Sequence, residues 1–132
     1  MDKDGPKILI ISKKTLRVET QVGISWQGSR VRDWLNNTFK NDSFSKEECS
    51  KILQTLLLPE YTIDSIFLLN QLEAEKYFPS AESRKSLSYG WWLRDIANEE
   101  VYYYVNGNGS ITSFTGYDAK GIRPAMWIDL TA

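Results

Sequence analysis

The sequence predicts an α+β domain in which helices are segregated from an antiparallel β-sheet. An apolar run typical of a strand opens the chain at residues 7–12, and capping patterns typical of helices follow between residues 29 and 78. From Trp91 onward, aromatic and β-branched residues alternate with polar ones, as they do in strands. A chain of 132 residues is long enough for one core, so we expect a single domain over residues 7–132, preceded by a flexible tail of residues 1–6.

The first expected elements are a strand and a helix. The Asp4-Gly5-Pro6 turn signal precedes the apolar run, and residues 13–24 predict a second, irregular strand and a loop. Ser29 is then placed to cap a helix. The apolar residues that follow it at helical spacing are Val31, Trp34, Leu35 and Phe39.

Two capping boxes predict the next helices. In Ser45-Lys46-Glu47-Glu48, the serine hydroxyl and the last glutamate carboxylate can each accept a bond from the other residue's backbone N–H. We expect this helix to continue its apolar face as far as Leu56. Asn70-Gln71-Leu72-Glu73 repeats the pattern after a β-run at residues 64–69. It predicts a short helix that ends before a polar loop of residues 79–90.

The C-terminal third of the chain predicts the sheet. Residues 101–105 alternate between an aliphatic-rich face and a face that carries tyrosines. Asn106-Gly107-Asn108-Gly109 predicts a hairpin, because asparagine and glycine tolerate the positive φ of type I′ turns. Residues 111–115 are expected to return along this hairpin. After a second loop at residues 117–121, residues 122–130 are expected to form the closing strand.

Seven short segments together carry a resemblance to a known family. They are Trp26–Asn36, Phe44–Glu48, Asp64–Leu69, Glu73–Phe78, Trp91–Arg94, Tyr104–Gly109 and Gly121–Ile128. In this order, over most of residues 7–130, they resemble an uncharacterised bacterial domain family grouped with C-type-lectin-like and formylglycine-generating-enzyme-like folds. The resemblance implies two main helices flanking a twisted antiparallel sheet, with a long loop region that carries ligand-facing residues. It implies no established activity.

The chain departs from this family in two places. The family usually continues from the Trp91–Arg94 segment into Ser-Pro-Gly, whereas Asp95-Ile96-Ala97 follows here, which puts the family's loop path in doubt. Family members also usually begin with a further strand, which would pair with residues 7–12 and is missing from this sequence. We expect the resulting edge to be covered by the N-terminal tail or paired with a second copy of the chain.

The absence of histidine limits the chemistry. It excludes Ser-His-Asp and Cys-His catalysis in their usual forms, as well as zinc sites that contain histidine. The single cysteine cannot reproduce the cysteine pair that the resemblance to formylglycine-generating enzymes would require. We expect neither a metal nor another cofactor. Glycoside hydrolysis requires only two carboxylates, so a divergent carboxylate-based enzyme stays an alternative.

Charge and hydropathy limit the partners. The 16 basic and 17 acidic residues are interspersed, whereas nucleic-acid-binding surfaces cluster their basic residues, so no nucleic-acid partner is expected. No apolar run is long enough to cross a membrane, so no membrane insertion is expected. The polar N-terminus predicts no signal peptide. A cytoplasmic protein and a fragment of a bacterial surface or secreted protein therefore stay as alternatives.

The candidate ligand-binding residues lie in or beside the predicted sheet. They are Tyr89, Trp91, Trp92, Asp95, Tyr102, Tyr104, Asn106, Asn108, Tyr117 and Asp118. The two tryptophans point to opposite faces of an extended strand, so we expect one in the core and the other at the surface. The tyrosines predict an aromatic platform for a sugar or a peptide, with burial of that face beneath helices as the alternative.

Arg94 and Arg123 allow two interpretations. They form a pair of cations that bind a ligand anion, or each binds a carboxylate or backbone carbonyls and ties strands to loops. We favour the second, structural interpretation, and extend it to Arg32.

Three functions follow from these patterns. The leading hypothesis is a non-enzymatic binding module that contacts a protein or carbohydrate through the loops of residues 79–90 and 114–121. The second is a structural domain of a larger bacterial surface protein, which forms a homodimer through its exposed first strand. The third is the divergent carboxylate-based enzyme.

Overall fold

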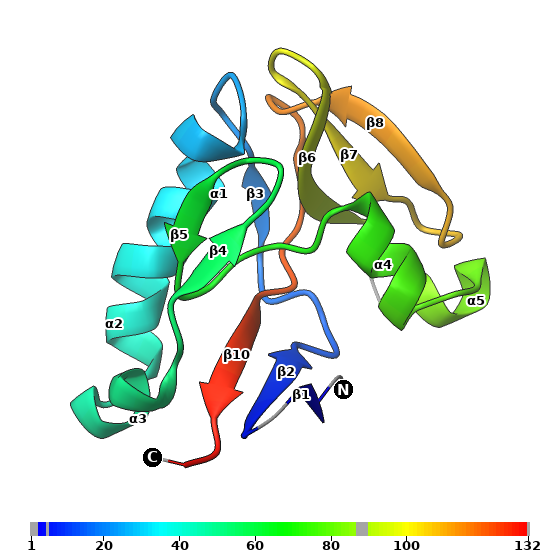
Figure 1. Cartoon of the computed structure of the whole chain (residues 1–132). Helices are drawn as coiled ribbons and strands as arrows, with labels where there is room; N and C mark the ends of the chain where they lie inside the picture. The colour runs from blue at the N-terminus through cyan, green and yellow to red at the C-terminus, as the bar shows by residue number, and fades with distance from the viewer. Residues whose placement is uncertain (1–2, 5, 87–89, 132) are drawn as a thin grey trace.

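Two β-sheets, a separate β-hairpin and a series of short helices make up the structure (Figure 1). This computed structural model describes residues 3–4, 6–86 and 90–131. The α+β class predicted from the sequence is confirmed. Among the described residues, no helix is both long enough and apolar enough to cross a bilayer.

The larger sheet has five strands in the order β3-β9-β6-β7-β8. The strands are β3 (Val18–Thr20), β6 (Trp91–Asn98), β7 (Val101–Val105), β8 (Ile111–Thr115) and β9 (Ala119–Gly121). β7 and β8 form the predicted antiparallel hairpin, which is closed by a 2.8 Å bond from the Asn106 N–H to the Ser110 carbonyl. β6 pairs antiparallel with β7 and parallel with β9.

The second sheet joins the two ends of the chain. β2 (Lys7–Ile11) pairs antiparallel with β10 (Ala125–Asp129), and β1 (Lys3–Asp4) pairs with the other edge of β2. Within the expected tail of residues 1–6, the structure places Lys3–Asp4 in this short strand. Of the two expected ways to cover the edge of β2, this structure shows the N-terminal residues doing so, opposite Lys7 and Ile8.

A continuous helical segment covers residues 30–43. It consists of α1 (Arg30–Trp34), the π-helical turn η2 (Leu35–Phe39) and α2 (Lys40–Ser43), and it follows the 3₁₀ turn η1 (Trp26–Gly28). Ser29 caps it as predicted, because its hydroxyl accepts bonds from the backbone N–H groups of Val31 and Arg32.

The next helix is shorter than predicted. α3 (Lys46–Lys51) has the expected capping box, with bonds of 2.8 and 3.1 Å between Ser45 and Glu48. The expectation that it continues to Leu56 is wrong. The chain leaves the helix at Ile52, which forms a bridge with Ile128 of β10, and then enters the hairpin of β4 (Thr55–Leu57) and β5 (Thr62–Asp64).

The β-run expected at residues 64–69 is a strand only at its start. Beyond β5 the chain is extended and buried, and it makes a single bridge between Phe67 and Ala125. The second capping box is confirmed, since Asn70 and Glu73 cap α4 (Gln71–Tyr77). The expected loop of residues 79–90 contains a further helix, α5 (Ala81–Arg84).

The core is built around two runs that are buried along their whole length. In residues 66–69 and 91–94 no residue is more than 1% exposed. The runs are joined by a bond of 3.0 Å from the Arg94 N–H to the Leu69 carbonyl. A strand covered on both faces loses the alternation of apolar and polar residues, which explains why Trp91 and Trp92 can be adjacent and both internal.

Candidate functional site

The predicted aromatic platform is largely internal. Trp91, Trp92 and Tyr102 are at most 1% exposed, so the expectation of one tryptophan at the surface is corrected. The Trp91 indole N–H donates to the Arg84 carbonyl on one side of the sheet, and the Trp92 indole N–H donates to the Glu19 carbonyl on the other. Both faces of β6 are covered, and the side chains of these three residues are used for packing.

The exposed part of the platform lies along β7–β9. Tyr104 is partly exposed and Tyr117 is 59% exposed. The Lys120 ammonium lies 4.3 Å from the centre of the Tyr104 ring and 2.8 Å from an Asp118 oxygen. This hydrogen bond lowers the pKa of Asp118. Tyr89, which was expected to join the platform, lies outside the described residues.

The two candidate asparagines form the hairpin turn. The Asn106 side-chain oxygen accepts from the N–H groups of Asn108 and Ser110, each at 3.1 Å. The Asn108 oxygen also accepts from the Ser110 N–H. These bonds are local to the turn, as expected for asparagine in a tight hairpin.

Arg94 is surrounded by acceptors. Its guanidinium donates to the carboxylates of Glu60 and Glu73 and to the carbonyls of Leu58 and Leu68. The residue is 1% exposed, so a ligand anion has no access to it in this structure. Arg32 is bound similarly, to Asp64 and to the Gln27 carbonyl.

Arg123 differs from the other two arginines. Its guanidinium carbon lies 4.6 Å from the Trp91 ring centre and 4.9 Å from the Phe78 ring centre, and its Nε donates to the Ser12 carbonyl. Among the described residues, its buried Nη1 has no hydrogen-bond partner. Burial lowers the pKa of Arg123 to about 10.

Asp95 is half-buried and directly follows the buried run of residues 91–94. One of its carboxylate oxygens accepts from the backbone and side-chain N–H groups of Gln71. The other oxygen is buried without a partner among the described residues. Burial raises the pKa of Asp95, and the nearby charge of Glu60 adds to this effect, while the bonds from Gln71 oppose it.

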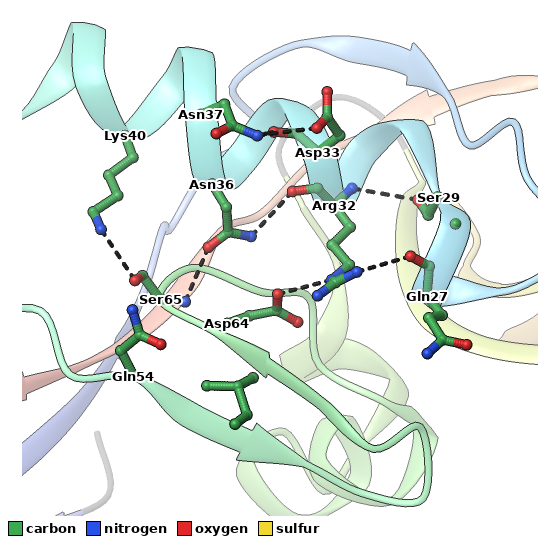
Figure 2. Close-up of a pocket in the computed structure, with 12 residues that line it drawn as sticks. Gln27, Ser29, Arg32, Asp33, Asn36, Asn37, Lys40, Gln54, Asp64 and Ser65 are labelled. Atoms are coloured by element: carbon green, nitrogen blue, oxygen red, sulfur yellow. Dashed lines mark hydrogen bonds and ion pairs between the residues drawn. The ribbon is translucent and has the colours of Figure 1, made fainter.

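A polar cleft that the sequence did not predict separates the helical segment from the β4–β5 hairpin (Figure 2). Its volume is about 610 Å³. The helical side supplies Gln27, Gly28, Ser29, Arg32, Asp33, Asn36, Asn37 and Lys40, and the other side supplies Gln54, Ile63, Asp64 and Ser65.

Asn36 joins the two sides of the cleft. Its amide nitrogen donates to the carbonyls of Arg32 and Ile66, at 3.0 and 2.8 Å. Its oxygen accepts from the N–H groups of Ser65 and Ile66, both at 2.9 Å. All the usual bonding positions of this amide are occupied, so Asn36 holds the walls rather than a ligand.

Asp64 forms the floor of the cleft. One oxygen accepts from the Arg32 guanidinium at 2.8 Å, and the other accepts from the Trp26 indole and the Thr62 hydroxyl, at 3.0 and 2.8 Å. The Asp64 side chain is only 3% exposed. Both carboxylate oxygens of Asp64 are therefore hydrogen-bonded, and these bonds fix the side chain at the base of the cleft.

Other polar groups in the cleft remain available. Figure 2 shows the side-chain amides of Gln27 and Gln54 without a bond to another lining residue. The Lys40 ammonium donates to the Ser65 hydroxyl at 3.1 Å and has no salt bridge to a carboxylate of a described residue. Asp33 accepts a bond from the Asn37 amide on the helix surface. These groups can bind a polar molecule without disturbing the walls.

The π-helical turn explains where two of these groups lie. The Lys40 N–H donates to the Leu35 carbonyl, five residues earlier, which widens the helix at Asn36 and Asn37. Such turns occur frequently at functional sites. In the sequence, the only indication of this turn is the pair Asn36-Asn37 inside a predicted helix, where asparagine is unfavourable.

The described residues contain no group of three or more acidic, cysteine or histidine side chains that could hold a metal ion. No curated protein and no solved structure matches the chain. A family model described as a domain of unknown function, DUF6273, matches residues 7–130. Because this match covers nearly the whole sequence, the chain belongs to the DUF6273 family.

Proposed function

We propose that the protein is a non-enzymatic binding module and that a neutral, polyhydroxylated ligand such as a short oligosaccharide occupies the polar cleft. The observation that carries the proposal is the cleft between η2 and the β4–β5 hairpin, which has prebuilt walls and unbonded amides. Ligand sites are concave and largely preformed, with a few polar groups that fix orientation.

The charges of the lining residues favour a neutral ligand. Two cations, Arg32 and Lys40, are balanced by two carboxylates, Asp33 and Asp64. Amide, ammonium and carboxylate groups together can donate to and accept from the hydroxyls of a sugar. Ile63 offers an apolar contact at the rim.

The finer fold assignment is part of the same proposal. We infer a C-type-lectin-like arrangement from the resemblance of the sequence segments. The mostly antiparallel β6–β9 region supports it, as do the flanking helical segments. The loops of residues 79–90 and 114–121, with Tyr104 and Tyr117, are the competing ligand surface.

A glycan array followed by calorimetry tests the proposal. We expect an oligosaccharide to bind the wild-type chain. Gln54→Ala and Lys40→Met should each weaken its binding about five- to tenfold, because each removes one or two hydrogen bonds. Tyr117→Ala is the matched control and should bind normally. Loss of binding in Tyr117→Ala alone would place the ligand on the competing surface instead.

Two further outcomes contradict the proposal. If no glycan on the array binds, the carbohydrate assignment fails. If a bound oligosaccharide is cleaved on incubation, the protein is an enzyme and not a binding module.

Self-association is a second candidate function, and the edge of β2 favours it. Within the part of the chain that the structure describes, β1 pairs with Lys7 and Ile8 of β2, and Ile10, further along that strand, is 41% exposed. An open strand edge can accept another strand. Light scattering over a wide concentration range checks this candidate, because a monomer at every concentration would exclude it.

A further inference from the structure

The outer face of the β4–β5 hairpin is apolar and exposed. Leu56 and Ile63 are direct cross-strand partners and are 56% and 60% exposed. Leu58 and Tyr61 adjoin these strands in the turn that joins them and are 51% and 77% exposed. Single exposed apolar residues are ordinary, but a contiguous group marks an interaction site. We call these four residues the hairpin surface.

The fold does not require these side chains to be apolar. The inner face of the hairpin closes the core, with Leu57, Thr62 and Asp64 at most 4% exposed. A two-stranded hairpin with one buried face normally presents polar residues on the other. The hairpin surface therefore departs from the pattern expected of a sheet face that meets only water.

Tyr61 provides independent evidence. Its φ of 58° lies in the left-handed region, which asparagine or glycine adopts more easily than tyrosine. At 77% exposure, its ring gains little from burial to offset this cost. Strained residues of this kind cluster at binding sites, which is consistent with a contact between Tyr61 and another molecule.

The charge behind the hairpin surface indicates what kind of molecule this is. Glu60, which adjoins Tyr61, shares the Arg94 guanidinium with Glu73. Two carboxylates that share one cation leave an excess of one negative charge, which a basic partner would complement.

We propose that the hairpin surface docks a protein segment that presents apolar side chains next to a lysine or arginine. The apolar side chains cover the hairpin surface, and the cation lies toward Glu60. Ile63 also borders the polar cleft, so the segment passes along the rim of that cleft. The inference goes beyond the proposed function, because it needs no ligand in the cleft.

Selection from a phage-displayed library of random peptides tests the proposal. The immobilised full chain is the bait, and the double variant Leu56→Ser/Tyr61→Asn is used for comparison, since neither position lines the cleft. Leu130→Ser is the matched control, because Leu130 is also half-exposed, at 49%, but lies at the end of the chain beyond β10. Thermal melts verify that all variants fold.

The expected peptides combine apolar residues with lysine or arginine. Synthetic copies should bind wild type and Leu130→Ser equally, bind the double variant about tenfold more weakly, and lose affinity as salt is added. Oligosaccharide binding should be unchanged in the double variant, which separates this surface from the cleft.

Several results would overturn the proposal. One is that no peptide is enriched, or that the enriched peptides are acidic or bind the double variant as well as wild type. Another is a concentration-dependent dimer that the double variant abolishes, because a second copy of the chain would then occupy the surface. Binding of phosphatidylcholine vesicles that requires Leu56 and Tyr61 would identify a lipid surface instead.

Discussion

Arg94 and Arg123 are both buried, yet their charges meet different surroundings. Arg94 is bound by two carboxylates, whereas Arg123 is held by one carbonyl and two aromatic rings. Removing one partner of a buried ion pair leaves the other charge uncompensated, which is more costly than losing the pair as a whole. The two arginines should therefore respond very differently to the same substitution.

We expect Arg94→Met to lower the free energy of unfolding by about 3–5 kcal/mol, because the largely buried Glu60 and the partly buried Glu73 are left without a cation. Arg123→Met should change the free energy of unfolding by less than about 1.5 kcal/mol. Methionine retains the packing between Trp91 and Phe78, and its introduction leaves no carboxylate without a partner. Urea denaturation of both variants measures the difference. Equal losses would mean that Arg123 has an anionic partner.

Asp95 predicts an unusual dependence of stability on pH. Because its pKa is raised on folding, the folded state binds more protons than the unfolded state between pH 3.8 and the folded pKa. The contribution of Asp95 to stability is therefore greatest at low pH and is lost as the pH rises through the folded pKa. Asp95→Asn should be more stable than wild type at pH 7, and this advantage should shrink toward pH 4. Urea midpoints across this range measure it, and an advantage independent of pH would contradict the assignment.

At the scale of elements, the two capping boxes have the same design but different surroundings. Glu48 caps α3 at the surface, whereas Glu73 caps α4 and also binds Arg94. Both boxes could be predicted from sequence, because a cap depends on residues only three positions apart. The second role of Glu73 could not, because Arg94 is 21 residues away.

Glu48→Ala should destabilise the protein by about 1 kcal/mol, the usual value of a capping interaction. Glu73→Ala should destabilise it by about 3 kcal/mol or more, because the cap and a buried ion pair are lost together. Denaturation of the two single variants compares them directly. If the two variants lost the same free energy of unfolding, the role of Glu73 as a partner of the buried Arg94 would be refuted.

The β7–β8 hairpin is tied to α5 through its turn. Gly109 has a φ of +89°, and a Cβ atom there would overlap the Ala81 carbonyl, whereas a Cβ at Gly107 would meet open space. Gly109→Ala should therefore cost about 3 kcal/mol or more and loosen α5, while Gly107→Ala should stay within about 1 kcal/mol of wild type. Thermal melts and hydrogen exchange of the α5 amides measure both effects. Unchanged protection of α5 in Gly109→Ala would show that the turn does not hold this helix.

Errors in the predicted elements share one physical origin. Residues 52–57 contain enough apolar side chains for a helix face, but the Leu53 N–H bonds to the Trp127 carbonyl in β10 and draws the chain into extended structure. Trp91 and Trp92 were expected on opposite sides of a half-exposed strand, but both sides are covered. In each case a contact with a distant segment overrides the local pattern.

At the scale of the whole molecule, the candidate site is a product of tertiary structure. The cleft forms only where the helical segment of residues 30–43 meets the β4–β5 hairpin, and Asn36 bonds to Ile66 across 30 positions of sequence. The fold class, the β7–β8 hairpin and the helix caps could be predicted, because each depends on a residue pattern that spans only two to four positions. No local pattern predicts that two walls distant in sequence come together. The Asn36-Asn37 pair was therefore the only indication of the cleft in the sequence.

The pairing of β2 with β10 has a mechanical consequence. Lys7 lies opposite Asp129, and the Leu130 N–H donates to the Pro6 carbonyl at 2.6 Å, so the start of β2 and the end of β10 lie side by side. Tension applied to the two ends would load the bonds between these strands one after another, like a zipper, rather than all at once in shear. The domain should open at low force when held by its ends in optical tweezers.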